Sequence, residues 1–428
     1  MSGNVYQTLR GRGYVYQSTD EAALEKALAS GSLAFYAGFD PTADSLHVGH
    51  LLPVMAMRQL QMAGHKPIAL VGGATALVGD PSGKQEARPI LSKEKVAANT
   101  AAIKEQLSRF IDFSDGNALL VDNADWLADL NLLDFLREVG SRFGVNRMIA
   151  AESVKSRLET GISYLEFSYM LLQAYDFHIL NQRFGCLLEV GGQDQWGNIV
   201  AGVELIRKLS RKEAHGLTFP LLTDRAGAKF GKTAGGAVWL DTNRTSVFDY
   251  YQFWRNVDDA DMGKLLRLFT TLPLDEIERL ESLEAPAINR SKEILAFEAT
   301  CLAHGPEAAE KAYLAATAEF GSADPEGKIE TSSKIAGIAA GAAAGKELPR
   351  HAVPRSDAEN GLWIVKLLAD SGLASSNGEA RRLLKGGGVY LNDERITDMD
   401  RNVAINDFTD GAAILRAGKK NIREIVLA

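Results

Sequence analysis

Residues 33–71 read LAFYAGFDPTADSLHVGHLLPVMAMRQLQMAGHKPIALV, and this stretch decides the fold class. Residues 33–39 form a short apolar run rich in aromatics, which is typical of a buried parallel strand. Apolar residues then recur at helical spacing over 47–62, and a glycine ends the run. After the break Lys66-Pro67, residues 68–71 form a second apolar run. A strand, a helix and a strand in this order predict a βαβ crossover.

The alternation of strands and helices continues beyond this unit. We expect helices over 93–110, over 163–180 and from about residue 195, and strands over 186–190 and 218–222. This pattern predicts an open α/β sheet with helices on its faces. After Trp239 the pattern is helical through about Phe320. The run Ala336–Gly345, followed by Pro349 and Pro354, indicates a boundary before a C-terminal module, although its alanines could instead extend a helix.

The composition is that of an ordinary globular protein. The chain has 428 residues, a formal net charge of −8, 46% hydrophobic residues and 24% charged residues, which exclude collagen, coiled coil and wholesale disorder. The net acidity argues against a general nucleic-acid coat. No apolar run reaches the length of about 18 residues that a membrane span needs, and the N-terminus has no signal-peptide pattern. We therefore expect a cytoplasmic protein with no membrane partner.

Cysteine and histidine usage limits the metal chemistry. Cys186 and Cys301 are the only cysteines, so a disulfide framework is excluded and a reducing compartment is favoured. Only His47 with His50, and Cys301 with His304, are close enough in sequence to suggest paired metal ligands. Neither pair has a second pair nearby, so we expect no metal site.

The first functional signal is DPTADSLHVGH at residues 40–50. His47 and His50 open a helix after a strand, which places them at the carboxyl end of the sheet, where open α/β sheets bind ligands. A helix N-terminus favours anions, and imidazoles can stabilise phosphate charge in a transition state. Gly49 would let a base or ribose approach the backbone. The alternative is two ordinary histidines at a helix start.

The second signal is DRAGAKFGKT at residues 224–233. It is not a P-loop, because only three residues separate Gly227 from Gly231 and no amphipathic helix follows. What remains is a glycine-rich loop with Lys229 and Lys232, which could close over a triphosphate and neutralise a leaving pyrophosphate. A solvated basic turn is the alternative.

Two more glycine-rich segments follow strands. Residues 72–84, GGATALVGDPSGK, hold Asp80 and Lys84 over the edge of the sheet, and Arg88 comes soon after. Residues 190–197, VGGQDQWG, suit a sugar–phosphate ligand at the same edge. The alternatives are a glycine-rich connection with surface charges and a plain polar turn.

The fifth signal lies on a predicted helix. Tyr169, Gln173 and Asp176 are spaced i, i+4 and i+7, so they share one helical face. Three hydrogen-bonding residues on such a face indicate a polar pocket. An exposed helix face is the alternative.

Taken together, these blocks resemble the bacterial-type tyrosyl-tRNA synthetases of class I, and the resemblance runs essentially from end to end. The spaced histidines are similar to the first signature of the class, and KFGKT is similar to a variant form of the second. The resemblance implies a ligase that makes tyrosyl-adenylate from tyrosine and ATP, then transfers tyrosine to the 3′-terminal adenosine of tRNA(Tyr). A hydroxyl-specific pocket would reject phenylalanine; the known magnitude of that discrimination was measured on this enzyme type.

The resemblance also implies the substrate contacts. Tyr36 and Asp176 would bind the phenol, and the rest of the tyrosine site would comprise Asp80, Tyr169, Gln173 and Gln195. ATP would be held by Gly38, Asp40, His47, Gly49, His50, Gly192, Asp194 and Lys232. The groups acting on the leaving pyrophosphate would be Thr42, His47, His50, Lys84, Arg88, Lys229, Lys232 and Thr233. Mg²⁺ should accompany ATP without a dedicated protein site.

The C-terminal module resembles a small RNA-binding domain shared with a ribosomal protein. Its basic residues, which would contact tRNA phosphates, are Arg381, Arg382, Lys385, Lys419, Lys420 and Arg423. The predicted domains are a Rossmann-like catalytic domain at 1–235 with a dimer-interface insertion at about 85–160, a helical anticodon-region domain at 236–335, a linker at 336–358 and a small α+β RNA-binding domain at 359–428.

The family is homodimeric, and an apolar stripe could supply the interface. Leu132, Leu136, Val139 and Phe143 recur at helical spacing. An ordinary core-facing helix is the alternative.

Two other functions compete with tyrosine–tRNA ligation. One is a related synthetase for tryptophan or a nucleotidyltransferase with the same spaced histidines, and the other is an RNA-binding protein without catalysis. The phenol pair Tyr36 and Asp176 and the basic tail disfavour the first, and the intact histidines and lysines disfavour the second.

Overall fold

The structure is a computed structural model of the chain. It describes residues 4–82, 92–159, 161–223, 230–233, 236–338, 350–392, 394–408, 411–418 and 421–427. The chain divides into two compact units, Met1–Ala340 and Gly341–Ala428, and each is treated by itself.

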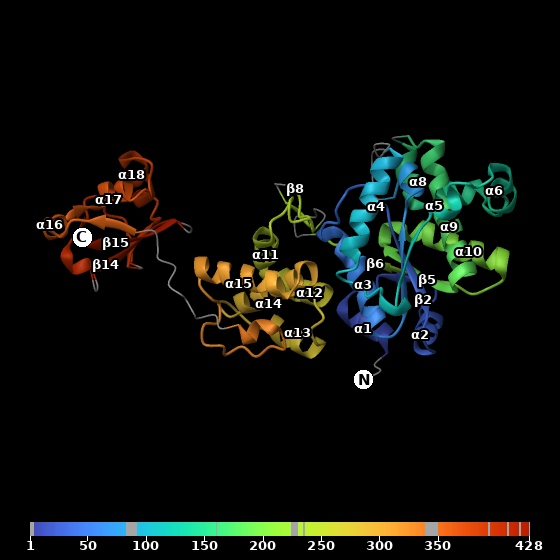
Figure 1. The fold of residues 1–428 in the computed structure, drawn as a ribbon, viewed down its shortest axis with the longest axis horizontal. Helices are drawn as coiled ribbons and strands as arrows, with labels where there is room; N and C mark the ends of the chain where they lie inside the picture. Colours follow the sequence, from blue (N-terminus) through green and yellow to red (C-terminus); the bar gives the residue numbers. More distant parts are fainter. Residues whose placement is uncertain are drawn as a thin grey trace. The chain divides into compact units, whose positions relative to one another are not determined.

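A six-stranded sheet forms the centre of the first unit (Figure 1). Its strands are β1 (Gln17–Ser18), β2 (Ala34–Phe39), β3 (Lys66–Val71), β4 (Leu119–Asp122), β5 (Cys186–Gly192) and β6 (His215–Phe219). Their order is β1-β6-β5-β2-β3-β4, and all pairs are parallel except β1 with β6. The crossover from β2 to β3 confirms the predicted βαβ unit. The reversal of chain order between β5 and β2 is the kind of position at which open sheets bind ligands.

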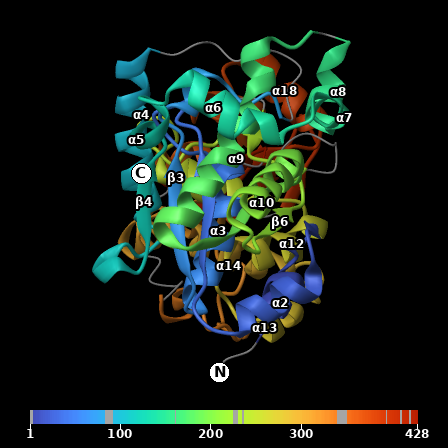
Figure 2. The ribbon, with the colours of Figure 1, turned by 90° about the vertical axis from the view of Figure 1, so that its right-hand side faces the viewer.

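The helices of this part of the unit surround the sheet. They are α1 (Val5–Arg12), α2 (Glu21–Ala29), α3 (Leu51–Met62), α4 (Lys93–Leu107), α5 (Ala124–Leu127), α6 (Leu132–Glu138), α7 (Val145–Ala150), α8 (Glu152–Leu158), α9 (Tyr164–Phe184) and α10 (Trp196–Ser210). Figure 2 shows α9 and α10 side by side, and both contact β5.

The two faces of the sheet bury different clusters, as the alternation of side chains along a strand requires. Phe35 and Ala37 of β2 pack with α3 in the largest core cluster. Tyr36, between them, belongs to a second cluster with Phe177 of α9. α3 therefore covers one face, and α9 with α10 covers the other. Tyr36 points toward α9, and this orientation places it in the site described below.

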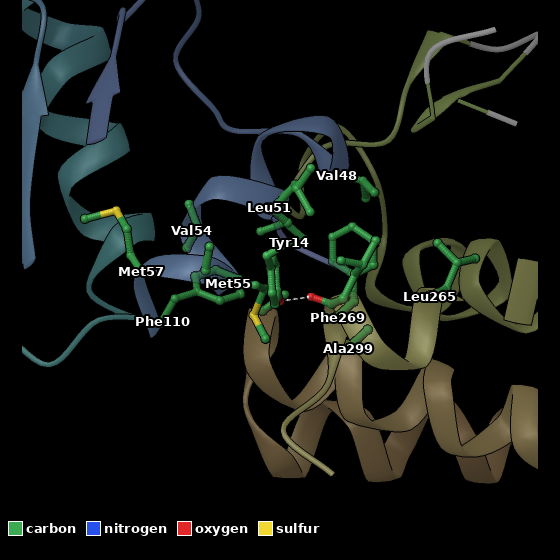
Figure 3. Packing of buried hydrophobic residues seen from close by; sticks show 14 of the residues in the cluster. Tyr14, Val48, Leu51, Val54, Met55, Met57, Phe110, Leu265, Phe269 and Ala299 are labelled. Atoms are coloured by element: carbon green, nitrogen blue, oxygen red, sulfur yellow. Dashed lines mark hydrogen bonds between the residues drawn. The ribbon is translucent and has the colours of Figure 1, made fainter. Parts of the chain in front are cut away.

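A helical segment completes the first unit. Its helices are α11 (Val247–Arg255), α12 (Asp259–Phe269), α13 (Leu274–Glu281), α14 (Ile288–His304) and α15 (Pro306–Phe320). Figure 3 shows apolar residues of α3, such as Leu51 and Met55, in one core with Phe269 of α12 and Ala299 of α14. The Tyr14 hydroxyl donates to the Leu268 carbonyl in this core. The sheet and the helical segment therefore share buried side chains.

Some predicted boundaries were wrong. β3 begins at Lys66 and includes Pro67, because a proline is tolerated at the start of a strand. β6 spans His215–Phe219 and ends before Pro220, so the predicted strand 218–222 was placed too late. The stripe of four apolar residues does not lie on one helix, because α6 ends at Glu138.

That stripe is also divided by its burial. Leu132 is 66% exposed and Leu136 42%, whereas Val139 is 2% exposed. Phe143 follows the helix in extended backbone and packs against a small buried cluster. Two of the four residues are thus in the core or against it, and two face outward.

The second unit has its own core and a five-stranded sheet of order β12-β11-β14-β15-β9. Its strands are β9 (Arg350–Val353), β10 (Leu362–Trp363), β11 (Val389–Leu391), β12 (Glu394–Ile396), β13 (Asn402–Val403), β14 (Ala412–Ala417) and β15 (Asn421–Leu427). Its helices are α16 (Arg355–Asn360), α17 (Ile364–Asp370) and α18 (Asn377–Lys385). The fold class is therefore the predicted one, an α/β sheet domain with a helical part and a small C-terminal α+β module.

Residues 339–349 of the predicted linker lie outside the described residues, whereas its residues 350–358 include β9 and the start of α16. Among the residues that the structure describes, no helix combines the length and apolarity needed to cross a bilayer.

Candidate active site

A pocket of about 470 Å³ opens at the carboxyl ends of the parallel strands. Its walls begin where β2, β3, β5 and β6 stop, and α9 supplies a further wall. The pocket has a buried polar floor and an open mouth at the start of α3, and the two are built differently.

Tyr36 and Asp176 form the floor. Tyr36 is 1% exposed and Asp176 is 2% exposed. The Trp126 indole nitrogen donates to Asp176 Oδ1 over 2.7 Å, and Asn123 Nδ2 donates to Asp176 Oδ2 over 2.9 Å. Each carboxylate oxygen keeps further acceptor capacity. The floor can therefore accept a hydrogen bond from a ligand hydroxyl.

A chain of hydrogen bonds braces the floor from neighbouring strands. Asn123 Nδ2 also donates to Thr75 Oγ1 over 2.9 Å, and Thr75 Oγ1 donates to Asp40 Oδ1 over 3.1 Å. The Tyr169 hydroxyl donates to Asp40 Oδ2 over 3.1 Å. Residues that follow β2, β3 and β4 are thus tied to α9 through side chains alone.

A second series of hydrogen bonds runs along the pocket wall beside the floor. Gln195 Nε2 donates to Asp80 Oδ2 over 2.7 Å, and Asn198 Nδ2 donates to Gln173 Oε1 over 2.9 Å. Gln173 Nε2 then donates to Glu189 Oε1 over 2.9 Å. A ligand ammonium placed between Asp80, Tyr169 and Gln173 would meet oxygen acceptors on each of them.

Burial governs the protonation of the floor. Burial raises the pKa of Asp176. The Asn123 and Trp126 donors lower this pKa, and the neighbouring Glu189 raises it further. Burial also raises the pKa of Tyr36 well above its ordinary value, with Glu189 adding to the effect. The Tyr36 hydroxyl therefore stays protonated and can act as a hydrogen-bond donor.

At the mouth, His47 and His50 lie around the short 3₁₀ turn η1 (Val48–His50). Their rings stack with centroids 3.8 Å apart. His47 Nδ1 accepts from the Gly49 N–H over 3.0 Å, and His50 Nδ1 accepts from the His47 N–H over 3.2 Å. Because each Nδ1 is an acceptor, we assign the proton of each neutral ring to Nε2. The backbone thus prepares two N–H donors for an anion.

Glycine is required at two places in this wall. A Cβ at Gly49 would lie 2.8 Å from Cε1 of the His47 ring, so only glycine allows the ring to fold back over the turn. A Cβ at Gly72 would collide with Oδ1 of Asp40 and Oγ1 of Thr75. Gly49 makes room for the His47 ring and also lines the pocket, so the approach of a base or ribose to it stays a prediction.

Residues 238–244, which follow the KFGKT motif, run beside His47 and His50. The Val48 N–H donates to the Val238 carbonyl over 2.9 Å, and Trp239 packs its ring edge-on to His47 with centroids 5.6 Å apart. The Arg244 guanidinium lies 4.3 Å from the Trp239 ring centroid. Arg244 also forms an ion pair with Asp44 over 2.6 Å. Trp239 therefore restricts the orientation of His47.

Phe230, inside the KFGKT motif, is an anchor. Its ring contacts Phe253, Trp254 and Phe269, with centroids 5.3, 5.7 and 6.1 Å away. The aromatic residue of the motif is thus fixed in the helical segment, next to the turn that carries the histidines.

The predicted site residues are distributed as follows. The pocket is lined by Tyr36, Gly38, Asp40, Thr42, His47, Gly49, His50, Asp80, Tyr169, Gln173, Asp176, Gly192, Asp194 and Gln195. The structure describes only the backbone of Lys232 and Thr233, which form strand β7 and pair with β8 (Gly236–Ala237). Lys84, Arg88 and Lys229 lie outside the described residues.

Sequence reasoning missed five polar or aromatic residues of the site: Thr75, Asn123, Trp126, Glu189 and Asn198. Asn123 follows a strand that was not predicted, so its place at the carboxyl edge was not apparent. Glu189 carried a usable signal, because a carboxylate inside an otherwise apolar buried strand requires partners.

The basic residues of the second unit are only partly described. Arg381, Arg382 and Lys385 are exposed on α18, and the Arg381 guanidinium lies 5.3 Å from the Trp363 ring centroid. Arg423 is half-buried and its Nε donates to the Ser371 carbonyl over 3.1 Å. Lys419 and Lys420 lie outside the described residues.

Within the described ranges, no three or more His, Cys, Asp or Glu side chains lie close enough together to hold a metal ion.

Comparisons with known proteins show the family to which the chain belongs. Residues 28–321 match the family described as tRNA synthetases class I (W and Y), and residues 343–424 match a tyrosine--tRNA ligase SYY-like C-terminal domain. A tyrosine--tRNA ligase of Clostridium botulinum (strain Alaska E43 / Type E3) is 50% identical over 99% of both chains. One of Clostridium tetani (strain Massachusetts / E88) is 48% identical over 100% of both.

Solved structures are similar over about three quarters of the chain. A C-terminally truncated mitochondrial tyrosyl-tRNA synthetase of Aspergillus nidulans has 31% sequence identity and a TM-score of 0.67, covering 73% of this chain and 93% of that chain. The corresponding Coccidioides posadasii structure has 32% identity and a TM-score of 0.64, covering 72% of this chain and 91% of that chain.

Proposed function

The chain belongs to the class I tRNA synthetases of the tyrosine branch and joins tyrosine to tRNA with ATP; we propose that the pocket between the β2 and β5 strand ends is where it does so. The observation that carries this assignment is that one pocket is lined by a buried hydroxyl and carboxyl pair, Tyr36 and Asp176, and by a stacked histidine pair. The floor suits the amino acid and the mouth suits the phosphates.

Tyrosine selection would depend on the floor. The substrate phenol would donate to the Asp176 carboxylate and accept from the Tyr36 hydroxyl. Phenylalanine has no hydroxyl, so Asp176 would lose the hydrogen bond that the substrate adds to those from Asn123 and Trp126, and the buried Tyr36 hydroxyl would lose its acceptor, which is unfavourable. Asp80, Tyr169 and Gln173 would receive the ammonium group, and Gln195 would lie near the carboxylate.

Activation would be a direct displacement. A tyrosine carboxylate oxygen attacks the α-phosphorus of ATP, the bond from that phosphorus to the bridging oxygen breaks, and pyrophosphate leaves with the electron pair. No protein nucleophile is needed, so the chain contributes orientation and charge stabilisation. Gly38, Asp40, Gly192 and Asp194 would hold the adenosine. The Nε2–H groups of the histidines would donate to phosphate oxygens as negative charge grows on them.

We assign the leaving pyrophosphate to groups around the mouth. Thr42 and His47 line it. Lys84, Arg88, Lys229, Lys232 and Thr233 would act on the same anion, an assignment that is based on the resemblance of their motifs. Mg²⁺ takes oxygen ligands and usually binds through phosphates, so we propose that it enters with ATP and supplies further charge neutralisation there.

Transfer would follow in the same pocket. A ribose hydroxyl of the terminal adenosine of tRNA(Tyr) attacks the tyrosyl carbonyl carbon, and AMP leaves with the anhydride oxygen. The second unit would bind tRNA through phosphate contacts from Arg381, Arg382 and Lys385, which are exposed together on α18. Lys419, Lys420 and Arg423 would add to this surface, and the helical segment would face the anticodon region.

We further propose a two-fold homodimer that uses the region around α6 to α9. Exposed apolar side chains gather there: Leu132, Leu133, Leu136, Val145, Ile149, Tyr164 and Leu165. A second pocket of about 270 Å³, lined in part by Phe143, Met148 and Met170, lies in the same region. Apolar exposure of this extent is typical of an interface. Light scattering of Leu133→Glu should report monomers where the natural chain gives dimers.

The predicted cytoplasmic location is retained as a proposal. Cys186 and Cys301 are both free thiols in the structure, which suits a reducing compartment.

The decisive experiment is exchange of labelled pyrophosphate into ATP, measured with each of the twenty amino acids. We expect exchange with tyrosine alone. Exchange with tryptophan instead would overturn the substrate assignment, and absence of exchange with every amino acid would favour an RNA-binding protein without catalysis.

A further inference from the structure

A second buried carboxyl group lies beside the phenol pair. Glu189 on β5 is 2% exposed and lines the pocket. It is the register partner of Tyr36 on the neighbouring strand β2. Side chains of adjacent strands at matched positions point to the same face. Glu189 and Tyr36 are therefore neighbours on the α9 side of the sheet.

Both side chains carry a buried polar atom without a fully formed hydrogen bond. Among the described residues, neither Tyr36 Oη nor Glu189 Oε2 has a partner with full hydrogen-bond geometry, but the two groups lie close enough to shift each other's pKa. The other oxygen, Oε1, accepts from Gln173. Oε2 is bounded elsewhere by small groups: a Cβ added at Gly202 of α10 would lie 3.2 Å from it. Its available partner is thus on the Tyr36 side.

The titratable groups facing Glu189 are few. β2 contributes Tyr36 and α9 contributes Asp176, while Cys186 lies on the same strand. α10 and β6 contribute glycines at the nearest positions, Gly202 and Gly216. Asp40, which follows β2, raises the pKa of Asp176 through charge repulsion.

Hydrogen-bond donors distinguish the two carboxyl groups. Two carboxylates in one buried pocket do not both ionise readily. Asp176 receives N–H donors on both oxygens, whereas Glu189 receives one donor on one oxygen. Burial raises the pKa of Asp176 to about 8 and that of Glu189 to about 7, so the two groups share a proton near neutral pH. The substrate hydroxyl would add a third donor to Asp176, and this added donor would shift the negative charge to Asp176 and the shared proton to Glu189.

We propose that Glu189 is a positioning residue for tyrosine selection: as a neutral carboxylic acid it donates its proton to Tyr36 Oη, which obliges Tyr36 to point its own hydrogen at the substrate phenol. The inference rests on the proposed function of the pocket. Every donor then points the same way, from Glu189 to Tyr36, to the substrate hydroxyl and to the Asp176 carboxylate. No covalent bond is made or broken in this arrangement.

The arrangement predicts a pH effect of definite sign. Burial raises the pKa of Glu189 to about 7, and its contacts with Gln173 and Tyr36 oppose that rise. Above this pH Glu189 loses its proton and becomes an acceptor that competes with the substrate for the Tyr36 hydrogen. Ionisation of Asp176, whose pKa burial raises to about 8, acts in the opposite direction in every variant that keeps Asp176. The ratio of tyrosine affinity in the natural chain to that in Glu189→Gln should therefore fall as the pH rises through about 7.

The test uses tyrosine-dependent pyrophosphate exchange by the full chain. Glu189→Met removes the donor and should raise the KM for tyrosine about tenfold, with kcat within about twofold, the usual scale for one hydrogen bond. It should also lower the preference for tyrosine over phenylalanine by a similar factor. Glu189→Gln, whose amide can donate, should restore both values and should remove the part of the pH dependence that ionisation of Glu189 causes.

Tyr36→Phe is the matched control. In that background, Glu189→Met should cause no further loss of preference, because the hydroxyl it would position is gone. An unchanged preference in Glu189→Met, an equal loss in the Tyr36→Phe background, or the natural pH dependence in Glu189→Gln would each overturn the proposal. If Glu189→Met does not fold, the pH profile of Glu189→Gln still decides.

Failure of the proposed function would look different. The unmodified chain would then show no exchange with tyrosine at all, whereas failure of the Glu189 proposal leaves that exchange intact and changes only the ratios between variants.

Discussion

The floor and the mouth of the pocket hold their functional groups by different means. At the floor, Asp176, Asn123 and Thr75 are fixed by side chains of other elements. At the mouth, His47 and His50 are fixed by N–H groups of their own turn. Loss of one floor residue therefore leaves buried partners unsatisfied, whereas loss of one mouth residue removes a single donor. The floor should control which amino acid binds, and the mouth should control how fast it reacts.

Asp176→Ala should break the floor and have the largest effect. It leaves the Asn123 and Trp126 donors without an acceptor and removes the acceptor for the phenol. We expect kcat/KM for tyrosine in pyrophosphate exchange to fall by about 10³, from several hydrogen bonds at roughly 1–3 kcal/mol each. Asp129→Ala, an exposed aspartate near α5, is the control. Selectivity equal to that of the natural chain would show that Asp176 does not contact the phenol.

His47→Ala should weaken the mouth and leave the floor intact. Removal of one N–H donor to a developing anion typically costs about 10²-fold in kcat. The KM for tyrosine should change by less than about twofold, because the residue does not touch the amino acid. His351→Ala, in the second unit, is the control. A large rise in the tyrosine KM would contradict the division between floor and mouth.

A chain ending at Ile338 should keep both regions and lose tRNA binding. Pyrophosphate exchange should stay near the natural rate, and aminoacylation of tRNA should fall at least about tenfold because phosphate contacts are lost. A chain ending at Ser332 is the matched comparison. It also removes Ile335, which is fully buried, and the hydrogen bond from Ser333 to Glu298, so it should be less stable in thermal unfolding. Normal charging by the longer fragment would exclude the tail from the reaction.

Trp239→Leu should have the smallest effect of these changes and should show how far Trp239 contributes to holding His47. The substitution removes the ring edge against His47 and the surface under Arg244. An aromatic contact contributes about 0.5–1.5 kcal/mol, so kcat for exchange should fall about threefold with the tyrosine KM unchanged. Trp239→Phe should recover most of the rate. Equal rates for the leucine variant and the natural chain would mean that His47 is held by its backbone alone.

The sequence predicted the frame of the molecule well because its signals are local. Apolar runs and helical periodicity located β2, α3, β5 and α9, and the helical character after Trp239 was confirmed by α11 to α15. Boundaries were less accurate where turn residues misled, as at Pro67, which lies inside β3. The exposed and buried halves of the Leu132–Phe143 stripe could not be separated, because spacing does not reveal where a helix ends.

The site was predicted as a set of positions and not as a network. The pocket collects residues from widely separated segments. For most of the predicted residues, their placement after strands had implied this. The bonds from Asn123 and Trp126 to Asp176 depend on β4 and α5 meeting α9 in space, which no short motif encodes. The roles of the predicted residues therefore remain proposals to be tested by the variants above.

The two-residue strand β1 has a consequence for the handling of this protein. Gln17 and Ser18 pair with Leu217 and Thr218 along the outer side of β6, and the segment before them is held by Arg12, whose guanidinium donates to the Thr270 and Leu272 carbonyls. A chain shortened past residue 18 would uncover backbone N–H and C=O groups of β6, a strand whose five residues are all buried. Such an open strand is a template for aggregation, so expression tags belong ahead of an intact N-terminal segment.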